Sequence, residues 1–293
     1  MDKMSIDKIP IIDCHAHLLF PEKLTYPWMQ NLPYTLLIPK LTENEYKNDQ
    51  KNLPIKGLIF MEACPSDCLE EAKILENLSN EKDSIIIGII TGIPMKTDSN
   101  SIKDYLKKIA HNKLVGVRNL LKTDKMDRFY LEKEYSEKLQ LLKENNLPFH
   151  IGNNQYQLTD ILKFVKSNPD ITFLIDHLGN PFEPDGEKFN FWQENIDSLA
   201  TCDNLVMMKI SPGYCYPNNH LDKSGPYIEH VIKKFGSKRL VVGSDYGHGS
   251  GCVKFEDWIN LIRNVMIDLK LSQEDVENIF YRNAERIYNL NKN

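Results

Sequence analysis

The sequence predicts an α/β fold in which eight parallel strands close into one (β/α)8 TIM barrel. Short apolar segments alternate eight times with segments whose hydrophobic residues recur at helical spacing. The apolar segments are hydrophobic on both faces, as strands are when helices cover a parallel sheet. No linker or shift in composition divides the 293 residues, so we expect a single domain over 1–293. An open doubly wound sheet is the alternative, but no strand is followed by a Gly-x-Gly-x-x-Gly turn.

Each expected strand is an apolar run, and polar, Gly or Pro residues separate it from its neighbours. The expected strands cover residues 9–17, 56–62, 84–91, 113–119, 148–152, 171–177, 204–211 and 239–245. The expected helices cover residues 67–80, 101–111, 131–146, 157–167, 190–202, 224–235, 254–269 and 272–288. Between the first two strands we expect a loop over 18–51, rich in Pro and aromatic residues, which is either a pocket wall or a packed surface loop.

Composition and charge exclude several classes of protein. Hydrophobic residues make up 41% of the chain and charged residues 26%, which is typical of a globular protein. The net charge of −5 includes no clustered basic region, so we expect no nucleic-acid partner. No apolar run approaches the roughly 20 residues that cross a bilayer, and the N-terminal residues lack the apolar core of a signal peptide. The six cysteines are scattered, so we expect reduced thiols and a cytoplasmic protein.

Ionisable side chains gather at the carboxyl ends of the expected strands, where barrel enzymes place catalytic residues. His15 and His17 end the first strand at spacing two, so they project from the same face. The other strand ends contribute Glu62, Arg118, His150, His177, Lys209 and Asp245. Imidazoles with one carboxylate suit a single divalent cation such as Zn²⁺ with a position open for water, and Asp245 would accept a proton from that water. In a metal-free alternative Asp245 is still the base, and the histidines and Arg118 bind an oxyanion or a carboxylate.

Four short motifs resemble those of the amidohydrolase superfamily. They are Ile-Asp-Cys-His-Ala-His at 12–17, Gly-Val-Arg at 116–118, Leu-Ile-Asp-His-Leu-Gly-Asn-Pro at 174–181 and Val-Gly-Ser-Asp-Tyr at 242–246. Together they are most similar to the amidohydrolase-related branch, which holds 2-pyrone-4,6-dicarboxylate hydrolase and sugar-acid lactonases. The resemblance implies a hydrolase of a small carboxylate-bearing lactone or ester, in which water attacks the carbonyl.

The same resemblance implies roles for individual residues. Asp245 would act as the general base, and His177 would line the reacting carbonyl as a second catalytic residue. One divalent metal ion, Zn²⁺ in the first instance, would be held by His15, His17, His150 and Asp245. The expected substrate-binding residues are Arg118, Glu62, Lys209, Tyr214 and His248.

Several alternatives stay open at this point. Arg118 would instead form an internal salt bridge, His150 would be a buried structural residue, and Lys209 would pack under the rim. His248 would be a solvent-facing loop residue. A metal-dependent decarboxylase of an aromatic or muconate-type acid is the alternative function, and a barrel that only binds a ligand is a third. We expect a small-molecule substrate and no membrane partner, and we leave a homodimer open.

Overall fold

Eight parallel strands form one sheet and pair with one another in the order of the sequence. The structure, a computed structural model, describes residues 3–31, 41–109, 112–121, 128–181, 186–213, 221–247 and 253–290. The strands are β1 (Ile11–Ala16), β2 (Ile55–Met61), β3 (Ile86–Gly92), β4 (Leu114–Leu120), β5 (Phe149–Gly152), β6 (Phe173–Ile175), β7 (Leu205–Ile210) and β8 (Leu240–Val242).

The first strand also contacts the last, and this contact closes the sheet. Ala16 forms a parallel bridge with Tyr246. Beside it, the Asp245 N–H donates to the His15 carbonyl at 2.7 Å and the His17 N–H donates to the Tyr246 carbonyl at 2.8 Å. The predicted closed barrel is therefore confirmed, and the open doubly wound sheet is excluded.

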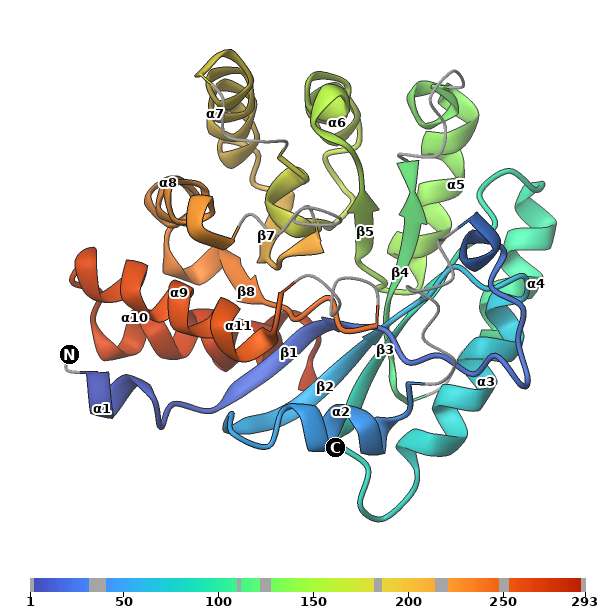
Figure 1. Ribbon diagram of the computed structural model, residues 1–293. Coiled ribbons are helices and arrows are strands. Elements are labelled where there is room, and N and C mark those ends of the chain that lie inside the picture. Colours follow the sequence, from blue (N-terminus) through green and yellow to red (C-terminus); the bar gives the residue numbers. More distant parts are fainter. Residues whose placement is uncertain are drawn as a thin grey trace.

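Helices surround the strands, and the barrel forms one continuous unit (Figure 1). The helices are α1 (Lys3–Ile6), α2 (Glu43–Asp49), α3 (Cys68–Ser79), α4 (Ser99–Ile109), α5 (Lys133–Glu144), α6 (Leu158–Ser167), α7 (Gly186–Ala200), α8 (Gly225–Phe235), α9 (Phe255–Asp268), α10 (Gln273–Glu277) and α11 (Asn283–Ile287). A large apolar cluster packs the helices against the outer faces of the strands. No helix in the described ranges is both long enough and apolar enough to cross a lipid bilayer.

The barrel interior contains a second apolar layer. The C-terminal segment packs against this layer at the end of the barrel opposite the carboxyl ends of the strands. Side chains that alternate along β1, β2, β6, β7 and β8 meet there, among them Ile12, Cys14, Met61, Leu174, Met207 and Val241. Ala284 from α11 and the adjacent Tyr288 pack against this layer and are themselves buried. The interior is thus filled by side chains, and this packed apolar layer lies beneath the polar groups at the carboxyl ends of the strands.

The structure differs from the sequence-based expectation in three places. The sixth and eighth strands end at Ile175 and Val242, earlier than expected, and His177 and Asp245 farther along adopt left-handed backbone conformations. The expected helix over 272–288 is interrupted by a π-helical turn, η10 (Asn278–Arg282). The expected loop over 18–51 contains helix α2, which a Thr42–Glu45 capping box begins; this sequence signal was readable in advance.

Candidate active site

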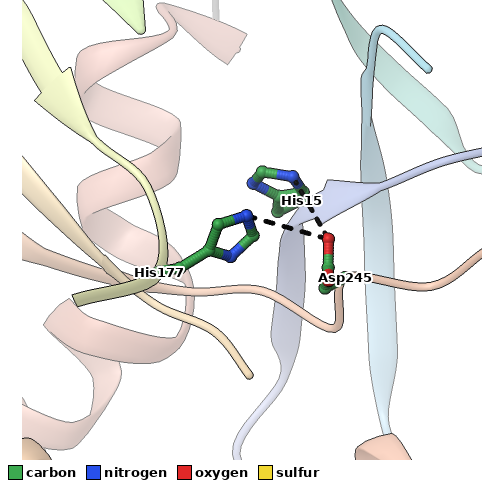
Figure 2. A group of neighbouring side chains, drawn as sticks. All are labelled: His15, His177 and Asp245. Carbon is green, nitrogen blue, oxygen red and sulfur yellow. Dashed lines mark ion pairs between the residues drawn. The ribbon is translucent and has the colours of Figure 1, made fainter. Parts of the chain in front are cut away.

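Three histidines and one aspartate converge at the carboxyl end of the barrel. His15 lies on β1, His177 begins the 3-10 turn η6 (His177–Gly179) after β6, and Asp245 follows β8 (Figure 2). His17 directly follows β1. All four side chains are buried. His15, His177 and Asp245 each place one potential ligand atom within 4.8 Å of the other two.

One oxygen of Asp245 lies at the centre of this group. Asp245 Oδ1 is 3.5 Å from His15 Nε2, 3.4 Å from His17 Nε2 and 3.8 Å from His177 Nε2. His15 Nε2 and His17 Nε2 are 3.2 Å apart. Four potential ligand atoms therefore face one small volume.

The backbone at two of these residues is strained. His177 has φ 51° and Asp245 has φ 53°, in the left-handed region that non-glycine residues avoid at a cost on the order of 1–3 kcal/mol each. Hydrogen bonds hold both conformations: the Asp245 N–H donates to the His15 carbonyl, and the Asn180 N–H donates to the His177 carbonyl at 2.7 Å. Strain of this kind tends to occur at functional sites, where it directs a side chain that a regular strand would direct elsewhere.

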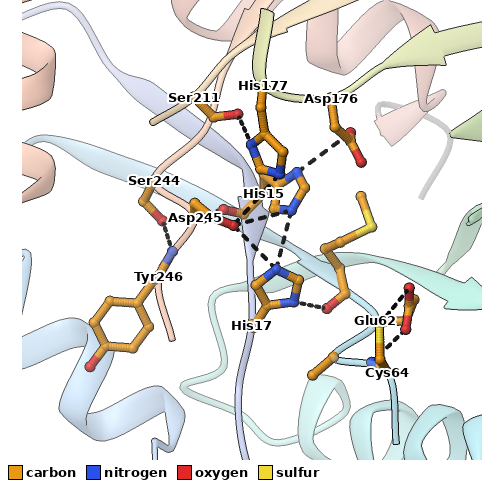
Figure 3. Close-up of polar contacts among 12 residues, drawn as sticks. His15, His17, Glu62, Cys64, Asp176, His177, Ser211, Ser244, Asp245 and Tyr246 are labelled. Carbon is orange, nitrogen blue, oxygen red and sulfur yellow. Dashed lines mark hydrogen bonds and ion pairs between the residues drawn. The ribbon is translucent and has the colours of Figure 1, made fainter. Parts of the chain in front are cut away.

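The second ring nitrogen of each histidine faces a protein oxygen (Figure 3). His17 Nδ1 is 2.9 Å from the Met61 carbonyl, which can only accept, so this nitrogen carries the proton. His177 Nδ1 is 2.8 Å from Ser211 Oγ, and His15 Nδ1 is 3.5 Å from Asp176 Oδ1. Each ring thus directs Nε2, the nitrogen suited to bind a metal, toward Asp245.

These residues fit a divalent metal ion. Atoms bound tetrahedrally at about 2.1 Å lie about 3.4 Å apart, which is close to the distances of 3.4 to 3.8 Å between Asp245 Oδ1 and the three Nε2 atoms. Burial holds the pKa of His15 well below its usual value, so its ring is neutral and one of its two nitrogens offers a lone pair. His15 Nε2 and His17 Nε2 are 3.2 Å apart and both lie next to a carboxylate oxygen, so these two nitrogens are close enough to bind one cation. Nitrogen and carboxylate ligands in this number are the set that Zn²⁺ prefers.

The sequence-based reasoning missed Asp176, a fully buried carboxylate beside this group. Asp176 Oδ1 is 3.2 Å from Lys209 Nζ, and Oδ2 is 3.3 Å from Arg118 Nε. Burial by itself would raise the pKa of Asp176, but Lys209, His15 and Arg118 hold it well below its usual value. The Asp-His pair at 176–177 was the available signal. Strict strand alternation would place only one of these two side chains inside the barrel, and the chain leaves β6 at Ile175.

A family model described as amidohydrolase matches residues 80–290. The chain belongs to the amidohydrolase family. The predicted family is thereby confirmed, and membership supports the predicted hydrolase class.

Similar proteins agree with this family assignment. The L-fucono-1,5-lactonase of Burkholderia ambifaria is 21% identical over 194 residues, which are 66% of this chain and 65% of that protein, less than two thirds of its length. A zinc-bound amidohydrolase from Burkholderia multivorans superposes with a TM-score of 0.81 at 19% identity, over 95% of this chain and 99% of the other.

Two further solved structures share the fold of this amidohydrolase. A "probable 2-pyrone-4,6-dicarboxylic acid hydrolase" from Acinetobacter baumannii, with citric acid bound, has a TM-score of 0.73 at 15% identity, over 95% of this chain and 99% of the other. The 2,6-dihydroxybenzoate decarboxylase from Rhizobium has a TM-score of 0.63 at 11% identity, over 97% and 99%. At these identities the likeness establishes the barrel and leaves the reaction open.

Within this amidohydrolase, Arg118 is already engaged by acidic side chains. Besides Asp176, its NH1 group donates to the Glu62 carbonyl at 3.3 Å and lies 3.7 Å from Glu62 Oε1. Glu62 Oε2 in turn accepts from the Cys64 N–H at 2.6 Å. These are the contacts of the internal salt bridge that the sequence left open, and the substrate-binding roles of Arg118 and Glu62 stay predictions.

His150 and Lys209 lie deeper in the barrel. His150 Nδ1 is 4.0 Å from Asp176 Oδ1, and its ring stacks on Tyr288 with 5.9 Å between centroids. Burial, and then the positive charge of Lys209, lower the pKa of His150 well below its usual value. The geometry thus groups His177, rather than His150, with the potential metal ligands. Lys209 is completely buried against Asp176. Tyr214 and His248 lie outside the described residues.

Proposed function

We propose that this amidohydrolase hydrolyses a small lactone or ester and uses one divalent metal ion, Zn²⁺ in the first instance. The observation that carries the proposal is the convergence of the His15, His17 and His177 Nε2 atoms on Asp245 Oδ1, at 3.4 to 3.8 Å. The Nδ1 atom of each ring is already turned toward a protein oxygen. The proposed ligands are therefore His15, His17, His177 and Asp245, and this set replaces His150 by His177.

The reaction would proceed by acid–base chemistry on Asp245. A bound divalent ion polarises a carbonyl and lowers the pKa of water. The Asp245 carboxylate accepts one proton from the attacking water and returns it to the alkoxide that leaves when the ring carbon–oxygen bond breaks. Lactone and water thus give one hydroxy acid. His177 Nε2 lies 3.8 Å from the same oxygen, and its Nδ1 lies 2.8 Å from Ser211 Oγ, so this ring would hold the metal ion beside Asp245.

The lactone substrate is supported by the name of the Burkholderia ambifaria relative. A carboxylate on the substrate was predicted from Arg118, which the structure shows paired with Asp176 and Glu62. We therefore propose to test lactones in matched pairs, with and without a carboxylate. The decarboxylase has only the shared barrel in its favour.

The deciding experiment measures metal content and turnover on the same preparation. We expect about one equivalent of zinc per chain, acid release from one or more lactones, loss of turnover with a chelator, and recovery when zinc is added back. Asp245→Asn should bring turnover close to background. Turnover that survives complete metal removal would favour the metal-free mechanism. Release of carbon dioxide from aromatic acids, with no lactone hydrolysed, would favour the decarboxylase.

A further inference from the structure

One carboxylate in the barrel interior joins side chains from four other strands. Asp176, after β6, lies 3.5 Å from His15 Nδ1 on β1 and 3.3 Å from Arg118 Nε on β4. It also lies 4.0 Å from His150 Nδ1 on β5 and 3.2 Å from Lys209 Nζ on β7. Among these neighbours only His15 also reaches Asp245 Oδ1.

Stability alone does not account for this cluster. Asp176 is 1% exposed and Lys209 is 0% exposed, so both charges are removed from water. A buried ion pair of this kind is on average no more stable than apolar side chains of the same size, because desolvation offsets the attraction between the charges. The arrangement therefore calls for a role other than holding the fold together.

His15 differs from the other two histidines in the oxygen that its Nδ1 faces. His17 faces a backbone carbonyl and His177 faces a hydroxyl, and both are neutral groups. His15 faces a carboxylate that Lys209 and Arg118 hold in place from its other sides. The negative charge of a carboxylate 3.5 Å from Nδ1 favours the imidazole proton on that nitrogen, which leaves the lone pair on Nε2 for a metal ion.

We propose that Asp176 is a positioning residue that fixes the ring orientation and tautomer of His15, with Lys209 and Arg118 holding the carboxylate toward that ring. Asp176 acts through His15 and does not touch the reacting atoms. The proposal rests on the proposed function in one respect, namely that His15 Nε2 binds the metal ion.

The test compares variants in which charge and shape are controlled separately. Asp176→Leu removes the acceptor but leaves Lys209 buried without its partner, and that change alone can prevent folding. The main comparison is therefore Asp176→Leu/Lys209→Met against Lys209→Met, because neither contains the unpaired lysine. Asp176→Asn keeps an oxygen acceptor without the charge. Asp160→Asn is the matched control, since Asp160 is 8% exposed and pairs with Arg128 and Lys163 on the outside of the barrel.

Two readouts are needed, zinc affinity by competition with a chromophoric chelator and the His15 tautomer by ¹⁵N NMR of the metal-free protein. We expect the double variant to bind zinc about 10- to 100-fold more weakly than Lys209→Met, and Asp176→Asn to lose less. The Nδ1-protonated form of His15 should dominate in the wild type and be lost in the double variant. Asp160→Asn should match the wild type in both measurements.

The outcomes separate this proposal from the proposed function. Equal zinc affinity in the double variant and Lys209→Met, or an unchanged His15 tautomer, would overturn the role of Asp176. The role of Asp176 would also be overturned if Asp176→Asn lost as much zinc affinity as the double variant while its His15 tautomer stayed as in the wild type. The negative charge alone would then affect zinc binding. If the wild type binds no zinc, the metal site is refuted. If the His15 tautomer still differs between the wild type and the double variant as expected, the positioning of His15 by Asp176 stands.

Discussion

Asp13 Oδ1 accepts a hydrogen bond from the Ser244 backbone N–H at 2.9 Å, although the two residues are 231 positions apart. The same oxygen accepts from the His15 N–H at 3.1 Å, and Asp13 Oδ2 accepts from the Tyr46 hydroxyl at 2.8 Å. One buried carboxylate therefore joins the first strand, helix α2 and the segment that carries Asp245. This connection lies directly beside the hydrogen bond from the Asp245 N–H to the His15 carbonyl.

Asp13→Ala should therefore destabilise the fold. Two backbone N–H groups and one hydroxyl lose their acceptor in a fully buried position, and we expect the free energy of unfolding to fall by about 2–4 kcal/mol. Urea unfolding measures the change. Tyr46→Phe removes only the third hydrogen bond and should cost less, about 1 kcal/mol. Equal losses in the two variants would show that Asp13 does not hold the two backbone segments together.

Gly213 should be required for the position of the His177 ring. A Cβ atom at Gly213 would lie 2.5 Å from His177 Nδ1, which is too close for any pair of atoms that are not bonded to each other. Gly213→Ala should displace the imidazole from Ser211 and Asp245 and lower kcat/KM on the order of 10- to 100-fold, with a smaller effect on stability. Gly225→Ala is the control, because the nearest atom to its Cβ is 4.0 Å away. Steady-state kinetics on both variants decide the question, and unchanged kinetics in Gly213→Ala would count against His177 as a site residue.

His150 should make the stability of the metal-free protein depend on pH. Burial first, and the charge of Lys209 second, lower the pKa of His150 well below 6.5, so the unfolded chain binds a proton there that the native chain does not. The free energy of unfolding should consequently fall as the pH drops below about 6.5, by up to about 1.4 kcal/mol per unit for this group. His150→Phe retains a ring against Tyr288 and should reduce that slope. Urea unfolding over about two pH units below neutrality measures the slope, and identical slopes would contradict the buried neutral histidine.

Zinc should stabilise the folded protein. A ligand that binds only the native state adds about 2.7 kcal/mol at one hundred times its Kd, so Tm should rise with zinc concentration. His177→Ala should lose most of this rise, whereas His230→Ala should retain it, because His230 pairs with Asp197 on the outside of the barrel. Thermal unfolding with and without zinc provides the measurement. A rise of the same size in His177→Ala would place the metal elsewhere.

Local patterns in the sequence predicted most of the fold. The strand segments were recognisable from apolar runs alone, since a strand that is buried on both faces is hydrophobic at nearly every position. Helix α2 was missed although its capping box can be read in the sequence, because the whole segment was interpreted as one loop from its Pro and aromatic residues. The left-handed conformations of His177 and Asp245 were not predicted, because such a conformation at a residue other than glycine leaves no clear signal in a sequence.

The sequence by itself determined that His15, His17, His177 and Asp245 would share one end of a barrel, because parallel strands all present their carboxyl ends at the same edge. Only the tertiary structure decided that Asp176 points inward beside them, that Arg118 is already paired, and that His150 lies below the group. These relationships depend on distances between residues far apart in the chain and on where the backbone leaves each strand. Alternation within a strand cannot supply either.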